Sequence, residues 1–280
     1  MLWNKNIRFC DINPTCYKIS TQKEIIKQKI RNLFSKEKFA KKKSHEKLPN
    51  IVFRFHSNMI KRAEGVDLTS QLNKAENIKI ASSKINGVIV HPGETFSFWE
   101  LVGKISKRRG YLEGRVIMKN KLVMGTGGGI CNLANTINRV ILHSPMTVTE
   151  FHKHSDALAP DEGPRVPLEA GTSVSYNYID YRFRNDTDQD VQFLIWCEGE
   201  ELFCELRSER EFPNRYELIE EGHHFQKEGE KYFRISKIYR SVTSKETGEQ
   251  IGKELVWDNH SEVMFDYSLI PTELIASGER

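Results

Sequence analysis

The chain has 280 residues, 38% of them hydrophobic and 29% charged, and a formal net charge of +4. This composition is that of an ordinary globular protein, and the length allows one large domain or two small ones. Collagen-like, low-complexity and wholly disordered chains are excluded. The sequence has no run of about 18 apolar residues, which excludes a transmembrane helix.

The N-terminal segment is strongly basic. Residues 1–47 contain thirteen Lys and Arg against four Asp and Glu, a net charge of +9, which leaves −5 for the rest of the chain. No continuous apolar stretch precedes a small-residue cleavage site near the start, so we expect no export signal and a cytoplasmic location. A basic segment can also contact an anionic membrane surface, which would make the protein membrane-peripheral.

A first helix is predicted to begin near Ser20, because Thr21 and Glu24 fit a capping box. It has an apolar stripe at helical spacing, formed by Ile26, Ile30, Leu33 and Phe34. We favour the interpretation in which this short stripe packs the helix onto the domain; the alternative is contact with a membrane. On either interpretation we expect the basic segment to be an appendage that folding of the rest does not require.

The middle of the chain changes from helical to strand periodicity. A second helix is predicted over 69–83, and two short strands flank the turn Pro92-Gly93. Residues 115–125 read as a hairpin. After the glycine-rich stretch 125–129, a helix is predicted over 130–143, because Ser144-Pro145 ends the helical pattern.

The remainder reads mostly as strands. We expect them at 148–151, 174–183, 191–197, 202–206, 216–219, 232–242 and 253–257. The fold class is therefore α+β, with a β-rich body and two or three helices. We divide the chain into a basic helical arm (1–47), a central domain (48–210) and a β-rich C-terminal extension (211–280).

The cysteines do not form a recognisable framework. Their odd number, five, and the absence of C-x-x-C spacing argue against paired disulfides and against a zinc ribbon. Cys197 and Cys204 flank Gly199 in a predicted hairpin, and we expect two reduced thiols there. We expect no metal and no cofactor.

Cys131 is the strongest candidate for a chemical role. It lies in the first turn of its predicted helix, away from the apolar stripe and on the side of Asn135 and Asn138. The helix start favours a thiolate and lowers a thiol pKa. Backbone amides of the preceding glycines, Gly127 to Gly129, could form an oxyanion hole for acyl transfer. Two other interpretations remain: an inert buried cysteine, or a phosphate at the helix start.

A cysteine nucleophile needs a base, and two histidines lie close together in FHKHS. His152 and His154 are two positions apart at the end of a predicted strand, so they point to the same side. Either could take the thiol proton, with Asp180 as an orienting group. The alternatives are loop histidines without a role, or half of a metal site completed by Cys131 or His91.

Several segments, in order, resemble the VanW family. They are NIKIAS (77–82), NGVIVHPGETFSFWELVG (86–103), RRGYLEG (108–114), GTGGGICNLANTI (125–137), FHKHS (151–155) and DYRFRNDT (180–187). The resemblance implies cell-wall chemistry linked to glycopeptide resistance. Some members resemble L,D-transpeptidases, whose nucleophile corresponds to Cys131 and whose histidine corresponds best to His154. Asn132 stands where the family usually has glutamine.

We therefore expect cysteine-dependent acyl transfer on peptidoglycan stem peptides or precursors, and no nucleic-acid partner. Cys131 would be the nucleophile, His154 or His152 the base, and Asp180 the orienting group. Gly127, Gly128, Gly129 and Asn132 would bind the oxyanion or the substrate. The alternatives are a non-enzymatic accessory protein that binds cell-wall precursors or partners, and a cysteine peptidoglycan hydrolase.

Overall fold

The computed structural model describes residues 8–62, 67–118, 121–153, 156–157, 160, 165–168 and 171–276. Within these ranges the fold is α+β with a β-rich body, as predicted. Three helices are long; two others span only four and five residues, too few for a periodic pattern in the sequence. The helices are α1 (Phe9–Ile12), α2 (Pro14–Phe34), α3 (Leu68–Ile85), α4 (Phe98–Val102) and α5 (Ile130–Leu142).

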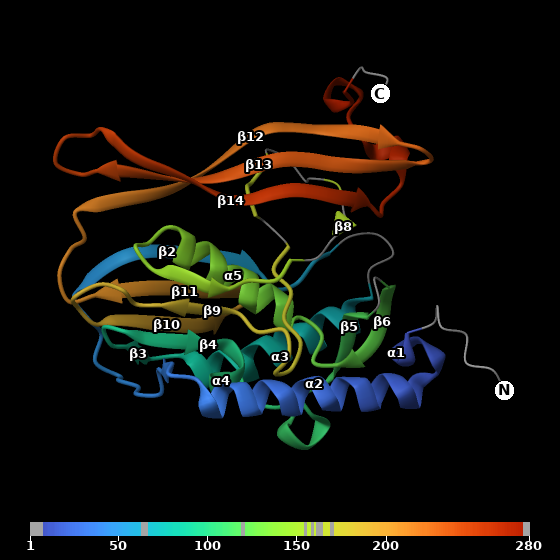
Figure 1. Cartoon of the computed structure of the whole chain (residues 1–280), viewed down its shortest axis with the longest axis horizontal. Coiled ribbons are helices and arrows are strands. Elements are labelled where there is room, and N and C mark those ends of the chain that lie inside the picture. The colour runs from blue at the N-terminus through green and yellow to red at the C-terminus, as the bar shows by residue number, and fades with distance from the viewer. Residues whose placement is uncertain are drawn as a thin grey trace.

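The strands of the described residues form three four-stranded sheets and one hairpin, β5-β6. The sheet orders are β1-β4-β9-β7, β2-β11-β10-β3 and β12-β13-β14-β8. The third sheet lies above the other two in Figure 1. The bounds are β1 (Lys38–Phe39), β2 (Asn50–Asn58), β3 (Val88–Val90), β4 (Glu94–Ser97), β5 (Glu113–Met118), β6 (Lys121–Thr126), β7 (Thr147–Glu150), β8 (Asp156–Ala157), β9 (Arg182–Arg184), β10 (Val191–Glu198), β11 (Glu201–Ser208), β12 (Asn214–Glu228), β13 (Lys231–Ser244) and β14 (Gln250–Val263).

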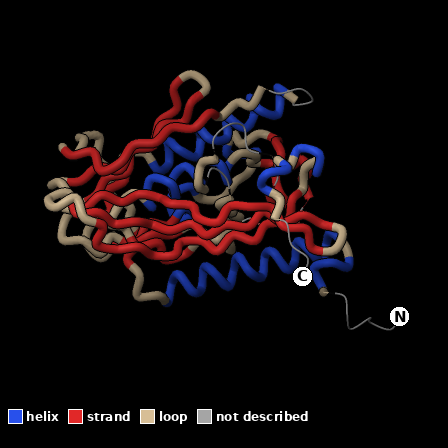
Figure 2. The backbone as a smooth tube through the Cα atoms, turned by 90° about the horizontal axis from the view of Figure 1, so that it is seen from above, coloured by secondary structure: helices blue, strands red, loops and turns tan. Residues whose placement is uncertain are grey.

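The C-terminal strands are antiparallel and longer than their sequence patterns predicted. Figure 2 shows the long strands running side by side across the molecule. In β12 the pairing register shifts between Glu221 and His224, and Gly222 has a positive φ of 64°. Such a bulge interrupts the period-two alternation. The strand therefore continues beyond the point where its pattern in the sequence ends.

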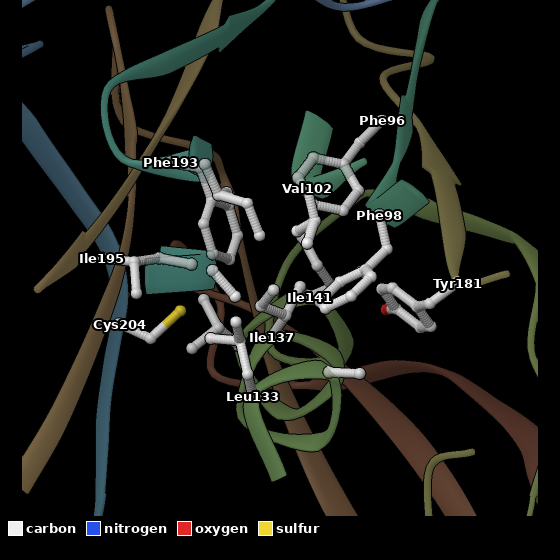
Figure 3. Packing of buried hydrophobic residues seen from close by; sticks show 14 of the residues in the cluster. Phe96, Phe98, Val102, Leu133, Ile137, Ile141, Tyr181, Phe193, Ile195 and Cys204 are labelled. Atoms are coloured by element: carbon white, nitrogen blue, oxygen red, sulfur yellow. The ribbon is translucent and has the colours of Figure 1, made fainter. Parts of the chain in front are cut away.

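The main core lies between α5 and the sheet that contains β10 and β11. Figure 3 shows Leu133, Ile137 and Ile141 of α5 pointing toward the sheet residues Phe193 and Ile195. All five are at most 1% exposed. Full burial of an aliphatic side chain contributes about 1.5–3 kcal/mol relative to exposure. The amphipathic pattern of α5 thus fixes which side of this helix faces the sheet.

The basic N-terminal segment is built into the body instead of being an appendage. Strand β1 pairs in parallel with β4, with Lys38 opposite Glu94, and Ala40 is 1% exposed in the core. The proposed division after residue 47 therefore cuts through packed structure. This two-residue strand has no local signal in the sequence, because its partner lies far along the chain.

The start of the first long helix also differs from the prediction. Helix α2 begins at Pro14, and the Asn13 side chain accepts a hydrogen bond from the Cys16 amide at 2.8 Å. Asparagine is a good N-cap and proline suits the first helical position, so this start is favourable. The capping box at Thr21 and Glu24 lies inside the helix.

The strand predicted over 174–183 is mostly a turn. Ser175 pairs with Ile179 through a 2.8 Å amide–carbonyl hydrogen bond, and Asn177 has a positive φ of 58°. Only Arg182–Arg184 form a strand, β9. Alternating apolar residues in this segment pack around a turn, which a period-two pattern alone does not distinguish from a strand.

None of the helices in the described ranges is long and apolar enough to cross a bilayer. The five cysteines are free thiols. In the β10-β11 hairpin, Cys197 lies opposite Leu202, and Cys204 lies opposite Ile195, so the two thiols are not cross-strand partners. The described side chains include no group of three or more His, Cys, Asp or Glu placed to hold a metal ion.

Candidate functional site at the start of α5

The triple glycine connects β6 to α5 in a closely packed turn. Gly127 and Gly129 have φ values of +90° and +96°, in the left-handed region that favours glycine. A Cβ on Gly128 would lie 2.7 Å from backbone atoms of Gly114, and one on Gly129 would lie 2.4 Å from Cγ of Lys74. Glycine is therefore required at these positions, because β5 and α3 lie too close to the turn to leave room for a side chain.

A buried asparagine that the sequence reasoning did not single out fixes this turn. Asn77 of α3 donates to the Gly128 and Leu112 carbonyls at 3.0 and 3.1 Å, and accepts from the Leu112 amide at 2.7 Å. It is fully buried. Its signal in the sequence was a polar residue on the inward side of a helix, where a hydrogen-bond partner is required.

The glycine amides are not equivalent as oxyanion donors. The Gly127 amide already donates to the Leu112 carbonyl at 2.9 Å, so its predicted oxyanion role is not supported. The amides of Gly128 and Gly129 donate to no other described residue. They lie directly before the first turn of α5, where unpaired amides attract negative charge.

Cys131 is the second residue of α5, and its thiol points toward the backbone of Val174. The Sγ atom donates to the Val174 carbonyl at 3.6 Å. Burial raises the pKa of the Cys131 thiol, opposite to the direction that we expected from the helix start. Loss of water around the sulfur disfavours the thiolate, and this effect outweighs the hydrogen bond with Val174.

The polar side of α5 is covered instead of open. Asn135 Nδ2 donates to the Leu168 carbonyl at 3.1 Å, and Asn135 Oδ1 accepts from Thr172 Oγ1 at 2.8 Å. Asn138 is also buried and contacts Thr172. Residues 171–174 therefore lie over the helix side that carries Cys131. We call these four residues the cover segment.

Asn132 carries a buried acceptor beside the cysteine. Its Oδ1 atom has no hydrogen-bond donor among the described residues. A buried carbonyl oxygen without a donor costs about 1–3 kcal/mol, so such groups often mark a place for a ligand or a water. This is consistent with the substrate-binding role predicted for Asn132, which stays a prediction.

The histidine segment runs alongside the cover segment. The Ser173 amide donates to the His152 carbonyl at 2.8 Å, and Lys153 bridges to Thr172. Ser173, which contacts the His152 backbone, directly precedes Val174. The Val174 carbonyl accepts the hydrogen bond of the Cys131 thiol. His154 lies outside the described residues.

The carboxylate in contact with His152 is Glu150. Its Oε1 atom lies 3.0 Å from His152 Nε2 and accepts from the Asp180 amide at 3.1 Å. Burial alone would raise the pKa of Glu150, but these hydrogen bonds and the nearby Arg182 outweigh it, so the pKa lies below its usual value. Glu150 is therefore ionised and placed to orient the imidazole.

Asp180 has a different environment from the one we predicted. Its carboxylate accepts from Ser97 Oγ at 2.5 Å, from Arg182 Nε at 2.9 Å, and from the Trp99 and Tyr181 amides. It is 1% exposed, and burial raises its pKa. These contacts satisfy the Asp180 carboxylate, and none of them comes from a histidine. The structure therefore supports a role for Asp180 in anchoring the surrounding backbone and Arg182, in place of a role in orienting a histidine.

Arg182 links this anchor to the N-terminal segment. It donates to Asn32 Oδ1 and Glu37 Oε2, both at 2.8 Å. Its Nε also lies 3.3 Å from Glu150 Oε2. One buried guanidinium thus joins α2, the Asp180 carboxylate and the carboxylate that contacts His152.

The C-terminal sheet closes over the histidine side of the site. Trp257 of β14 packs edge-on against Phe151, with ring centroids 6.4 Å apart, and a Cβ on Gly171 would lie 2.8 Å from its ring. Lys153 Nζ donates to the Asp258 carbonyl at 3.1 Å. The C-terminal sheet therefore contacts both the histidine segment and the cover segment.

Asn77, the triple glycine and Cys131 all lie in a part of the chain that matches a known protein family. Residues 73–207 match the family model described as VanW like protein. Those residues therefore form a VanW-family domain, which confirms the resemblance seen in the sequence.

Two curated proteins are similar to this chain. The vancomycin B-type resistance protein VanW of Enterococcus faecalis is 28% identical over 218 residues, which are 78% of this chain and 79% of that protein. The uncharacterized protein YoaR of Bacillus subtilis is 29% identical over 151 residues, 54% of this chain and 48% of that protein. No solved structure is significantly similar.

Proposed function

We propose that this protein modifies the cell wall in a response linked to glycopeptide resistance, by cysteine-dependent acyl transfer on peptidoglycan stem peptides or their precursors. The similarity to a vancomycin B-type resistance protein over 78% of the chain supports the cell-wall part. The acyl-transfer part rests on one observation: Cys131 follows two glycine amides, Gly128 and Gly129, that donate to no other described residue.

The proposed reaction has two steps. A histidine takes the Cys131 proton, and the sulfur attacks the carbonyl carbon of a stem-peptide amide. The carbon–nitrogen bond breaks, and the leaving amine takes the proton from the histidine. An amine of a second peptide then attacks the thioester, which releases the thiol and forms the new amide. The Gly128 and Gly129 amides stabilise the oxyanion in both steps.

The base is a histidine of the FHKHS segment. Glu150 holds His152 through a 3.0 Å contact, which supports His152 as a base with an orienting carboxylate. The family resemblance favours His154. In either case the cover segment must shift, because the Val174 carbonyl accepts the hydrogen bond of the thiol and burial keeps the pKa of that thiol high. Substrate binding would supply this shift.

The burial of the Cys131 thiol also favours a second function, that of a non-enzymatic accessory protein. The Cys131 thiol has a raised pKa and lies beneath the hydrogen-bonded cover segment. Such a site suits a protein that binds cell-wall precursors without turnover. A cysteine hydrolase is the third possibility. It would use the same residues, with water in place of the amine.

The three functions differ in the products that they give. The full chain would be incubated with a synthetic stem peptide, with and without an amine acceptor, and the products analysed by mass spectrometry. A cross-linked product supports acyl transfer, and a shortened peptide supports hydrolysis. Binding of unchanged peptide, measured by calorimetry, would contradict both enzymatic functions and support the accessory protein.

A further inference from the structure

Helix α2 exposes a row of large apolar side chains. Ile19, Ile26, Ile30 and Leu33 are 54%, 56%, 52% and 78% exposed. Their spacing of seven, four and three residues places them within about 60° around the helix. Phe34, 80% exposed, extends the row at its C-terminal end. We call these five residues the exposed stripe.

The opposite side of α2 holds the helix to the body through mostly polar contacts. Ile25 and Gln28 are buried. Asn32 donates to Glu100 of α4 at 2.9 Å and accepts from Arg182 of β9 at 2.8 Å. A surface helix ordinarily buries its apolar side and exposes its polar one. In α2 the orientation is reversed, so the sequence-based expectation that the stripe packs onto the domain was wrong.

Basic side chains flank the exposed stripe. At 100° per residue, Lys18 and Lys29 lie along one edge, and Lys27 and Arg31 lie along the other. Lys23 lies within the angular range of the stripe, between Ile30 and Phe34. The acidic side chain in this helix is Glu24, which is 41% exposed and lies 3.3 Å from Lys23 Nζ and 3.9 Å from Lys27 Nζ. As a whole, α2 carries five positive charges against one negative.

The position of α2 leaves this side accessible along its length. In Figure 1 the helix runs along the lower edge of the molecule, on the side opposite the C-terminal sheet. In the same picture the loop that contains the short helix Lys107–Arg109 reaches this edge. The Lys104 and Arg108 side chains of this loop are exposed. A flat, negatively charged surface could contact both.

We propose that α2 docks in the plane of an anionic lipid bilayer. The exposed stripe enters the boundary between headgroups and acyl chains, and the flanking lysines reach lipid phosphates. Lysine stems can lie along apolar surface while their ammonium groups stay at the headgroups. Apolar burial and attraction to anionic lipid act together, which is the combination that holds an interfacial helix.

The charge pattern favours lipid over a second copy of this chain. If the exposed stripes of two copies packed against each other, the Lys and Arg side chains that flank each stripe would lie close to those of the other copy. Like charges at a contact oppose association. An anionic bilayer, in contrast, offers opposite charge along the whole helix. The inference does not depend on the proposed acyl transfer.

Vesicle co-sedimentation of the full chain tests the proposal. We expect binding to phosphatidylglycerol vesicles, loss of that binding at high salt, and no binding to phosphatidylcholine vesicles. The combined Ile26→Ser, Ile30→Ser and Leu33→Ser variant should bind at least about a hundredfold more weakly. Replacing Lys18, Lys23, Lys27 and Lys29 by Gln should weaken binding about fivefold for each lysine.

The matched control replaces apolar residues of similar exposure elsewhere. Ile251 and Leu255 of β14 are 58% and 51% exposed, and Ile251→Ser with Leu255→Ser should leave vesicle binding unchanged. All variants change exposed side chains and should keep the thermal transition of the wild type. Equal binding of wild type and stripe variant, or no binding of the wild type to either vesicle, would overturn the proposal. Self-association that the stripe variant abolishes, without vesicle binding, would assign the stripe to a second copy.

Discussion

The thiol of Cys131 donates to the carbonyl oxygen of Val174 at 3.6 Å. The residue before Val174, Ser173, donates its amide to the His152 carbonyl at 2.8 Å. The cover segment therefore touches the cysteine on one side and the histidine segment on the other. Any reaction at Cys131 that uses His152 must begin with a movement of this segment.

Cys131 should react slowly with alkylating reagents in the native protein at neutral pH. Burial raises its pKa, so the thiolate fraction is small there and grows only as the pH rises above the usual thiol range. Limiting iodoacetamide with peptide mass spectrometry measures this, with Cys10 and Cys16 as internal references. Thr172→Ala removes two hydrogen bonds of the cover segment and should speed labelling of Cys131. Faster labelling of Cys131 than of the reference thiols in the wild type would contradict the burial argument.

Replacement of Asp180 should affect stability before it affects chemistry. Asp180→Ala leaves the Arg182 guanidinium, whose side chain is 6% exposed, without its closest buried carboxylate. Removing one partner of a buried ion pair costs about 3–5 kcal/mol. Chemical denaturation measures the loss, and Asp186→Ala, which removes an exposed partner of Arg184, is the matched control. A variant with wild-type stability and no activity would return Asp180 to a direct role in the site.

A methyl group on Gly128 should destabilise the turn before α5. The Cβ of Gly128→Ala would lie 2.7 Å from backbone atoms of Gly114, which cannot move aside as a side chain could. Overpacking of this kind costs about 1–3 kcal/mol. In Gly252→Ala the nearest atoms lie at 3.5 Å, an ordinary contact, so that variant should melt like the wild type. Equal melting of the two variants would mean that the triple glycine is not a packing requirement.

Deletion of residues 1–47 should abolish the cooperative thermal transition of the remaining chain. It removes β1, the buried Ala40 and the Asn32 and Glu37 partners of Arg182. Deletion of residues 1–12 ends before the Asn13 cap and removes no buried residue of α1, so this shorter chain should melt like the whole protein. A cooperative transition in the longer deletion would restore the view of residues 1–47 as an appendage.

The elements that the sequence predicted well are those whose signal is local. The start of α5 follows from glycines before an amphipathic run, and its end follows from Ser144-Pro145. The C-terminal strands follow from alternation within each strand. In both cases neighbouring residues carry the pattern.

The features that the sequence did not predict depend on distant partners. The exposed stripe of α2 looked like a packing face, but the contact of Asn32 with Arg182 turns the other side inward. Cys131 looked like an activated thiol, but residues about forty positions later cover it. Glu150 lies two positions before His152, so their contact is local and was missed, whereas the hydrogen bond that fixes Glu150 comes from the distant Asp180 amide.

The most direct test of the proposed function is the intact mass of the protein after incubation with a synthetic stem peptide. The acyl-transfer proposal predicts a covalent adduct on the wild type, none on Cys131→Ser, and the same thermal transition for both, since oxygen replaces sulfur at little packing cost. His152→Ala and His154→Ala, measured in parallel, identify the base. An adduct on Cys131→Ser at the wild-type level would contradict the assignment of Cys131 as the nucleophile.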